Sequence, residues 1–167
     1  KEDLLMAVRY YSGRDALFIF RPTVATTDDV TGQVEIKATQ WSLQAEVGLL
    51  STTTLGDSIN SFIPDRVSYT GSATLLYYEG DAEGNGNNLT GDLMSRVFKT
   101  GTGGVTTSDE AGFMLRIRGG SNEKHDMTLN GYLTSVSIGA TVGDIITAQV
   151  SFTANGALME TSMAALT

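Results

Sequence analysis

The amino-acid sequence predicts a mainly β protein: a β-sandwich or partial barrel of antiparallel strands with one short amphipathic helix packed on the sheet. Three observations predict this class. The chain is rich in threonine and has 19 glycines but only 2 prolines, a composition typical of strands joined by many turns. Several segments alternate apolar and polar residues with the period of two that marks a half-buried strand. One segment instead repeats its apolar residues at spacings of three and four, as a helix does.

The clearest strand covers residues 41–47, with the sequence WSLQAEV. Its alternation predicts one buried face, made of Trp41, Leu43, Ala45 and Val47. Just upstream, the apolar residues occupy the even positions 34, 36 and 38. The buried parity therefore flips near Thr39, and we expect a β-bulge or bend there.

The other strands are predicted at residues 15–22, 66–78, 112–118, 126–138 and 145–154. The last of them keeps Ile146, Ala148, Val150 and Phe152 on one face. In 126–138 the parity flips between Leu133 and Val136, which predicts a second long strand that bends or twists. A long bent strand can contribute to two curved sheet surfaces of the same chain.

The helix is predicted within residues 89–103, where Leu89, Leu93, Met94, Val97 and Phe98 recur at helical spacing. Gly101 is a suitable stop, Asn88 or Thr90 a suitable cap, and Asp92 suits the positive end of the helix dipole. We expect the side chains of Leu93, Val97 and Phe98 to be buried against the sheet.

Length, charge and cysteine content set further bounds. The 167 residues suffice for one domain with a sizeable core. The absence of cysteine excludes disulfide frameworks, zinc–thiolate sites and cysteine nucleophiles. A net charge of −8, with no basic cluster beyond Arg116 and Arg118, argues against binding nucleic acid through its phosphates. No apolar run approaches the ~18 residues of a membrane span, so no membrane partner is expected.

A polar stretch, 79-EGDAEGNGNNLTGD-92, has the ligand spacing of a calcium loop, with Asp81, Glu83, Asn85 and Asp92 at positions 1, 3, 5 and 12. The residues before it alternate as a strand, whereas a calcium loop of this type lies between two helices. Position 12 also carries Asp instead of the longer Glu. We therefore expect a polar strand-to-helix loop made of turn-forming Gly and Asn, and no metal.

Catalytic constellations are weak in this sequence. The only histidine, His125, lies in the turn-like polar segment 119–126, where a lone His is more often exposed than a base. The adjacent carboxylates Asp28-Asp29 and Asp109-Glu110 are expected to be solvated. The glycines of 101–104 follow a helix, so they do not form a phosphate cradle. A two-carboxylate hydrolase stays open as an alternative, because its pair can come from distant strands.

Two segments carry many apolar residues without a sustained period: the extended loop 48–65 and the C-terminal segment 156–167. Long loops of this kind are uncommon inside compact domains. Such side chains either fold back as a lid or dock on another subunit.

The succession 41–78, 92–105 and 145–158 resembles the major tail tube proteins of tailed bacteriophages. The shared pattern is a Trp-led strand, a Thr-rich loop ending in a Pro-containing segment, a Gly-Ser-Ala strand, one helix, and a closing strand ending in Asn-Gly-Ala-Leu. The resemblance covers residues 34 to 158. It implies a structural subunit without catalysis or cofactor, six copies of which form rings that stack into a hollow tube for DNA passage.

The resemblance also implies binding partners, a location in the virion and a domain organisation. The subunit would bind itself and other tail proteins, such as the tape measure and the tail terminator, and would reside in the virion after assembly in the host cytoplasm. A single tail-tube-like domain, 1–167, would carry an N-terminal arm (1–13), the loop 48–65 and a C-terminal arm (156–167) that bridge rings. Subunit contacts are expected at Leu49, Leu50, Leu55, Ile59, Phe62, Ile63, Leu158 and Met159, and acidic side chains facing the lumen at Glu35 and Glu46.

Two alternatives stay beside this one. The inner-tube protein of a contractile injection or secretion system shares the architecture. A β-sandwich adhesin or carbohydrate-binding module would instead need exposed aromatic residues on a flat face, whereas the alternation places Trp41 in the core.

Overall fold

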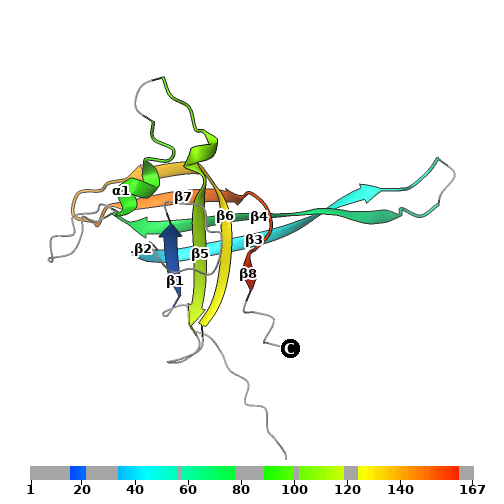
Figure 1. Ribbon diagram of the computed structural model, residues 1–167, viewed down its shortest axis with the longest axis horizontal. Coiled ribbons are helices and arrows are strands. Elements are labelled where there is room, and N and C mark those ends of the chain that lie inside the picture. The colour runs from blue at the N-terminus through cyan, green and yellow to red at the C-terminus, as the bar shows by residue number, and fades with distance from the viewer. Residues whose placement is uncertain are drawn as a thin grey trace, which may run out of the picture.

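The computed structural model describes residues 16–21, 34–55, 58–77, 89–99, 102–118 and 124–161. Within them the chain forms eight strands, one short helix and one 3-10 turn (Figure 1). In chain order these are β1 (Leu17–Arg21), β2 (Val34–Ile36), β3 (Ala38–Ser51), β4 (Phe62–Leu76), α1 (Leu89–Met94), η2 (Thr107–Asp109), β5 (Ala111–Arg118), β6 (Lys124–Gly139), β7 (Thr147–Ala154) and β8 (Glu160–Thr161).

All strands belong to one antiparallel sheet, in the order β2-β1-β5-β6-β7-β4-β3, and β8 pairs with β6. The prediction of a mainly β, antiparallel protein is therefore confirmed. The sheet curls into two layers whose strands cross steeply: β1 and β5 run across the direction of β7, β4 and β3 (Figure 1). Such crossing layers are one of the two ways in which sheets pack face to face.

Strand β6 passes from one layer to the other. Its first half pairs with β5 as far as Gly131, and its second half pairs with β7 from Gly131 onward. A Cβ atom at Gly131 would lie 2.2 Å from the carbonyl oxygen of Thr153, so only glycine fits at this corner. The register shifts between Leu133 and Ser135, which confirms the predicted change of parity in this strand.

The two ends of the sheet meet where β2 leads into β3, with only Lys37 between them. The backbone N–H of Leu76 in β4 donates to the carbonyl of Lys37 at 2.8 Å. The register of β3 against β4 shifts between Ala38 and Gln40, at the position where the sequence predicts a bulge. This irregularity turns the chain from one layer into the other.

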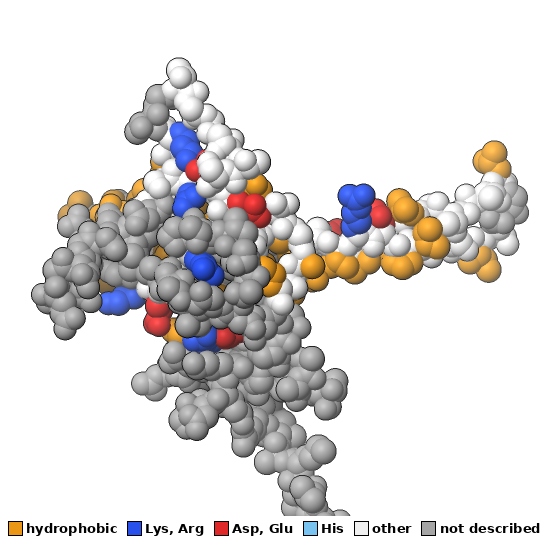
Figure 2. Space-filling view, viewed as in Figure 1, with side chains coloured by type: hydrophobic (Ala, Val, Ile, Leu, Met, Phe, Trp, Pro, Cys, Tyr) orange, Lys and Arg blue, Asp and Glu red, His pale blue; other side chains and the backbone are white. Residues whose placement is uncertain are grey.

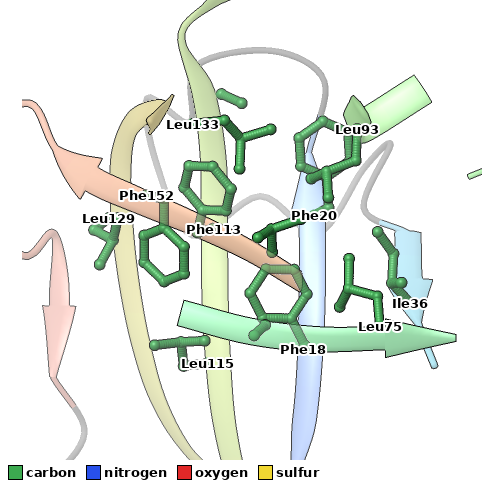
Figure 3. Packing of buried hydrophobic residues seen from close by; sticks show 13 residues of the cluster. Phe18, Phe20, Ile36, Leu75, Leu93, Phe113, Leu115, Leu129, Leu133 and Phe152 are labelled. Atoms are coloured by element: carbon green, nitrogen blue, oxygen red, sulfur yellow. The ribbon is translucent and has the colours of Figure 1, made fainter. Parts of the chain in front are cut away.

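The core lies between the layers (Figure 3). The rings of Phe113 and Phe152, from opposite layers, stack with centroids 4.6 Å apart, and Phe18 packs on both at about the same 6 Å spacing. A Cβ atom at Gly71 would lie 2.2 Å from the Phe152 ring. Because Gly71 has no side chain, the ring of Phe152 can pack directly against β4.

The helix is shorter than predicted. It ends at Met94, and the next residues form turns held by bonds from Arg96 N to Leu93 O and from Val97 N to Met94 O. Leu93 is fully buried, and Val97 packs against the core, but Phe98 is 52% exposed. The prediction that Phe98 is buried is wrong, because the helical spacing no longer sets side-chain directions after the helix ends.

The segment 48–65 is also not a loop throughout. β3 continues to Ser51 and β4 begins at Phe62, so that Leu50 pairs with Ile63. The same extension takes Ala45 and Val47 out of the core: both are exposed, although the alternation predicts a buried face. His125 lies in β6, opposite Ile117, and not in a turn.

Candidate assembly surfaces

The most unusual feature of the molecule is a long hairpin, drawn at the right of Figure 1, that leaves the two-layer body. Strand β7 pairs with β4 only from Thr70 onward. The eight residues from Phe62 to Tyr69 therefore extend beyond the rest of the sheet, with β3 as their only partner among the described strands. Eight residues correspond to about 26 Å of strand. We call residues 45–69 the arm.

One face of the arm is an apolar continuation of the core. Inside the body, Trp41 and Leu43 lie opposite Ala73 and Gly71 and pack on the core cluster. Further out the same alternation places Val47 opposite Val67, Leu49 opposite Pro64 and Ser51 opposite Phe62. The second layer does not reach them. Leu49 is 62% and Phe62 54% exposed, and apolar side chains run along one side of the arm in Figure 2.

The end of the arm is apolar on its other side as well. Leu50 and Ile63 face each other there and are each 50% exposed. Leu55 and Ile59 at the tip are almost wholly exposed. A contiguous apolar surface of this kind on a projecting element is typical of a site where another protein docks.

The four-stranded layer β6-β7-β4-β3 has two strand edges without a partner in the described part of the chain. One edge is β3 along its whole length, since β3 pairs only with β4. The other is the second half of β6, from Tyr132 to Gly139, which leaves β5 at Gly131 and pairs only with β7. Open edges of this length invite pairing with another chain.

A second exposed apolar group lies at the end of β6 and on the turn between β6 and β7. It consists of Ile138, Val142, Ile145 and Ile146, of which Val142 is fully exposed. Because β7 begins opposite Leu76, at the end of β4, this turn and the arm lie at opposite ends of the four-stranded layer. Sequence reasoning missed this group, since Ile145 and Ile146 read as the start of a buried strand.

The segment between α1 and β5 is held down by a buried carboxylate. Asp109, in η2, pairs with the ammonium of Lys99 and accepts the backbone N–H of Thr106 at 2.8 Å. The hydrogen bonds from Lys99 and Thr106 lower the pKa of Asp109 below its ordinary 3.8, against the effect of desolvation. The expectation that Asp109 is simply solvated is wrong, because its two partners come from turns that the sequence pattern does not place together.

An ion pair also joins β5 and β6. Arg116 donates two hydrogen bonds to the carboxylate of Asp126, both at 2.6 Å, and both side chains are largely buried. The two residues face each other in the register. Arg116 is thus a bidentate partner of a carboxylate within the subunit.

The other residues expected at contacts lie in different settings. Met159 is 42% exposed, whereas Leu158 packs partly on the core of its own subunit. Part of the predicted C-terminal arm is likewise docked, since β8 pairs with β6. Glu35 and Glu46 are both exposed. However, Glu35 lies opposite Ile19 on the β1 layer, and Glu46 lies opposite Ser68 on the other layer.

The described residues hold no group of three or more His, Asp or Glu side chains that could bind a metal ion. Three of the calcium-loop positions, Asp81, Glu83 and Asn85, lie outside the described residues, as do Asp28 and Asp29. The side chains of Asp92 and His125 are not described either. None of the helices in the described part of the chain is long and apolar enough to cross a membrane.

Comparison with known proteins matches this chain by structure and not by sequence. No protein-family model matches the sequence, and no curated protein matches it. The structure is similar to the SPP1 tail tube determined by solid-state NMR and cryo-EM, with 12% identity, a TM-score of 0.61, and 89% of this chain and 78% of that chain covered.

Two further solved structures are similar to it. The tail of an empty gene transfer agent particle, refined with C6 symmetry, matches at 10% identity and a TM-score of 0.57, over 92% of this chain and 100% of that chain. The tube-terminating cap of the anti-feeding prophage matches at 13% identity and a TM-score of 0.57, over 90% and 91%. The chain therefore has a phage tail tube-like fold.

Proposed function

We propose that this chain is the structural subunit of a phage-type tail tube, and that six copies form a ring and the rings stack into a hollow tube for DNA passage. The observation that carries the proposal is the arm: a hairpin whose apolar face is left half exposed by its own subunit. A monomer gains nothing from such a surface, whereas a polymer buries it at every contact. The tail tube-like fold supports the same conclusion.

The two free edges supply the contact within a ring. Pairing β3 of one subunit with the second half of β6 in the next would join their four-stranded layers into one continuous sheet. Such a contact uses two different surfaces, so it is heterologous and closes into a ring when its rotation divides the circle evenly. With four strands from each of six copies and a strand tilt of 35–45°, the barrel would measure about 45–50 Å between opposite backbones.

The arm supplies the contact between rings. It runs beyond the layer in the direction of the strands, so in a closed barrel it projects past the ring toward the next one. Leu49, Leu50, Leu55, Ile59, Phe62 and Ile63 would be covered there, with Met159 and the chain termini as further contacts. A contact between one end of a subunit and the other end of the next does not close, and therefore builds a filament.

The remaining partners follow from this role. The tape measure and tail terminator proteins would bind at the lumen and at the end of the tube, and the virion would be the place of function. The similarity to the anti-feeding prophage cap favours one second candidate, the inner tube of a contractile injection or secretion system. Observation of the native particle distinguishes the two, because only a contractile apparatus surrounds its tube with a sheath.

Electron microscopy of the purified chain tests the proposal. We expect rings or tubes with six-fold symmetry in negative stain. The matched variant replaces residues 47–67 with a two-residue Asn-Gly turn, which removes the arm but leaves Leu43 and Gly71 in place. This variant should stay folded, so that its far-ultraviolet circular dichroism signal, divided by the number of strand residues that remain, equals that of the wild-type chain. It should form no tubes. A wild-type protein that remains monomeric at high concentration and in the presence of tube ends would refute the proposal.

A further inference from the structure

Two Asn-Gly steps lie in the described part of the chain, Asn130-Gly131 and Asn155-Gly156, and their surroundings differ. In such a step the backbone nitrogen of the glycine can approach the side-chain carbonyl of the asparagine, because glycine has no Cβ atom in the way and a wide range of backbone conformations. This approach is the first step of deamidation, the loss of the side-chain amide. A third step, Asn85-Gly86, lies outside the described residues.

The step at Asn155 is open. Asn155 follows the last residue of β7 and is exposed. Gly156 has a φ of 110°, and a Cβ atom at this position would meet no atom within 4 Å. Among the described residues the N–H of Gly156 has no hydrogen-bond acceptor. The nitrogen of Gly156 is therefore free to move toward the Asn155 side chain.

The step at Asn130 is closed. It lies inside β6, where Gly131 pairs with Ala111 on one side and with Ala154 on the other. A Cβ atom at Gly131 would lie 2.2 Å from the carbonyl oxygen of Thr153. The backbone here can turn toward the side chain only after the strands separate, which requires local unfolding. Asn130 is thus an internal reference for Asn155.

Asn155 also ties neighbouring elements together. Its Nδ2 donates to Oε1 of Glu110, the residue before β5, at 3.0 Å. Its backbone N–H donates to the carbonyl of Asn130 at 2.7 Å. The end of β7 is thereby bound to the start of β5 and to the corner of β6.

The segment that follows, residues 156–161, is docked on the first half of β6. The backbone N–H of Met159 donates to the carbonyl of Thr128 at 2.9 Å, and Leu158 packs partly on the core. Strand β8, which pairs with β6, has only two residues. So short a strand holds weakly by itself, and the docking of the segment therefore depends on the anchor at Asn155.

We propose that Asn155-Gly156 is a site of spontaneous deamidation, and that the reaction releases the segment 156–161 from β6. The nitrogen of Gly156 bonds to Cγ of Asn155, the bond from Cγ to Nδ2 breaks, and ammonia leaves with the proton of the Gly156 N–H. Water then opens the succinimide ring at one of its two carbonyls, which gives aspartate or isoaspartate. Nothing is oxidised or reduced, and the inference does not depend on the proposed ring.

The product places two carboxylates together. Aspartate or isoaspartate at position 155 has no side-chain N–H, so repulsion between like charges replaces the hydrogen bond to Glu110. Lys99, in the neighbouring turn, is already paired with Asp109. Isoaspartate also adds a carbon atom to the backbone, which shifts the segment 156–161 against its partners on β6. Both products therefore weaken the anchor.

Incubation of the folded chain at neutral pH tests the reaction. Peptides are analysed by mass spectrometry, which detects the replacement of NH2 by OH, and an isoaspartyl methyltransferase labels isoaspartate. We expect Asn155 to convert at least about tenfold faster than Asn130, because Asn130 reacts only after the ladder opens. In the chain unfolded by urea the two should convert at similar rates. Equal conversion of the two in the folded chain would overturn the proposal.

A charge variant and its matched control test the release. Asn155→Asp reproduces the charge of the product. Adding Glu110→Gln restores the hydrogen bond with donor and acceptor exchanged, because the amide of glutamine donates to the new carboxylate. The measurement is the amide hydrogen exchange of segment 156–161, read beside that of β5.

Exchange in the segment should rise about tenfold in Asn155→Asp, stay unchanged in β5, and return close to the wild-type rate in the double variant. An unchanged rate in Asn155→Asp would show that the segment does not depend on this anchor and would refute the release. A double variant that exchanges as fast as Asn155→Asp would refute the part assigned to Glu110. All of these measurements are made on the unassembled subunit, so they stand or fall separately from the tube.

Discussion

Replacement of Leu49 by serine isolates the contribution of the arm to assembly. Leu49 is 62% exposed in the subunit, and full burial of a leucine side chain contributes about 1.5–3 kcal/mol. Covering the exposed part in the next ring is therefore worth about 1–2 kcal/mol per subunit. Each subunit that joins a tube makes this contact once. The concentration of subunits at which tubes begin to form should rise about 5–30-fold in Leu49→Ser.

The measurement is the sedimented fraction of protein against total concentration, read together with the thermal unfolding of the unassembled subunit. Unfolding should be almost unaffected, because substitution at an exposed position usually changes the free energy of unfolding by less than about 0.5 kcal/mol. The control is Phe98→Ser, which alters a side chain of similar exposure, 52%, at no proposed contact. An unchanged threshold for Leu49→Ser, or an equal shift in the control, would refute the reasoning.

Three further predictions concern the subunit itself. Phe152→Ala should lower the free energy of unfolding by about 3–5 kcal/mol in urea titrations, since it removes a fully buried stacked ring, whereas Phe98→Ala should cost less than about 1 kcal/mol; equal losses would contradict the packing. Asp109 has a depressed pKa in the folded state, so its stabilising effect is present above its ordinary 3.8 and is lost as the pH falls through the folded value. Asp109→Asn should therefore lower the melting temperature at pH 7 and flatten its decline in acid, and parallel pH profiles would count against the Lys99–Asp109 pair. Gly131→Ala should destabilise by about 1–3 kcal/mol or more, because the added methyl group meets the backbone of the next strand; an unaltered melting temperature would show that the corner can relax.

Much of the strand pattern can be predicted from the sequence because it depends on neighbours along the chain. Alternation of period two located six of the strands. The two changes of parity, near Thr39 and after Leu133, coincide with shifts of register: the first lies where β2 leads into β3, and the second lies just beyond the corner at Gly131. The composition likewise predicts a mainly β protein. These are local properties of the backbone and of side-chain order.

The exposure of those strands depends on the tertiary structure. The alternation that begins at Trp41 continues unchanged to Val47, yet the first residue packs on the core and the last lies on the arm. An apolar face can be covered by the same subunit or by another one, and the order of residues is the same in both cases. Only the point where β7 stops pairing with β4 decides between them.

The acidic residues of the strands show the same difference between what the sequence predicts and what the tertiary structure decides. The sequence supplies Glu35 and Glu46 as acidic residues within strands, but their separation onto two layers follows from the curl of the sheet. By itself the sequence determined which residues can share a face of one strand. The tertiary structure decided which strands share a surface, because pairing between strands distant in the chain depends on the packing of the whole core.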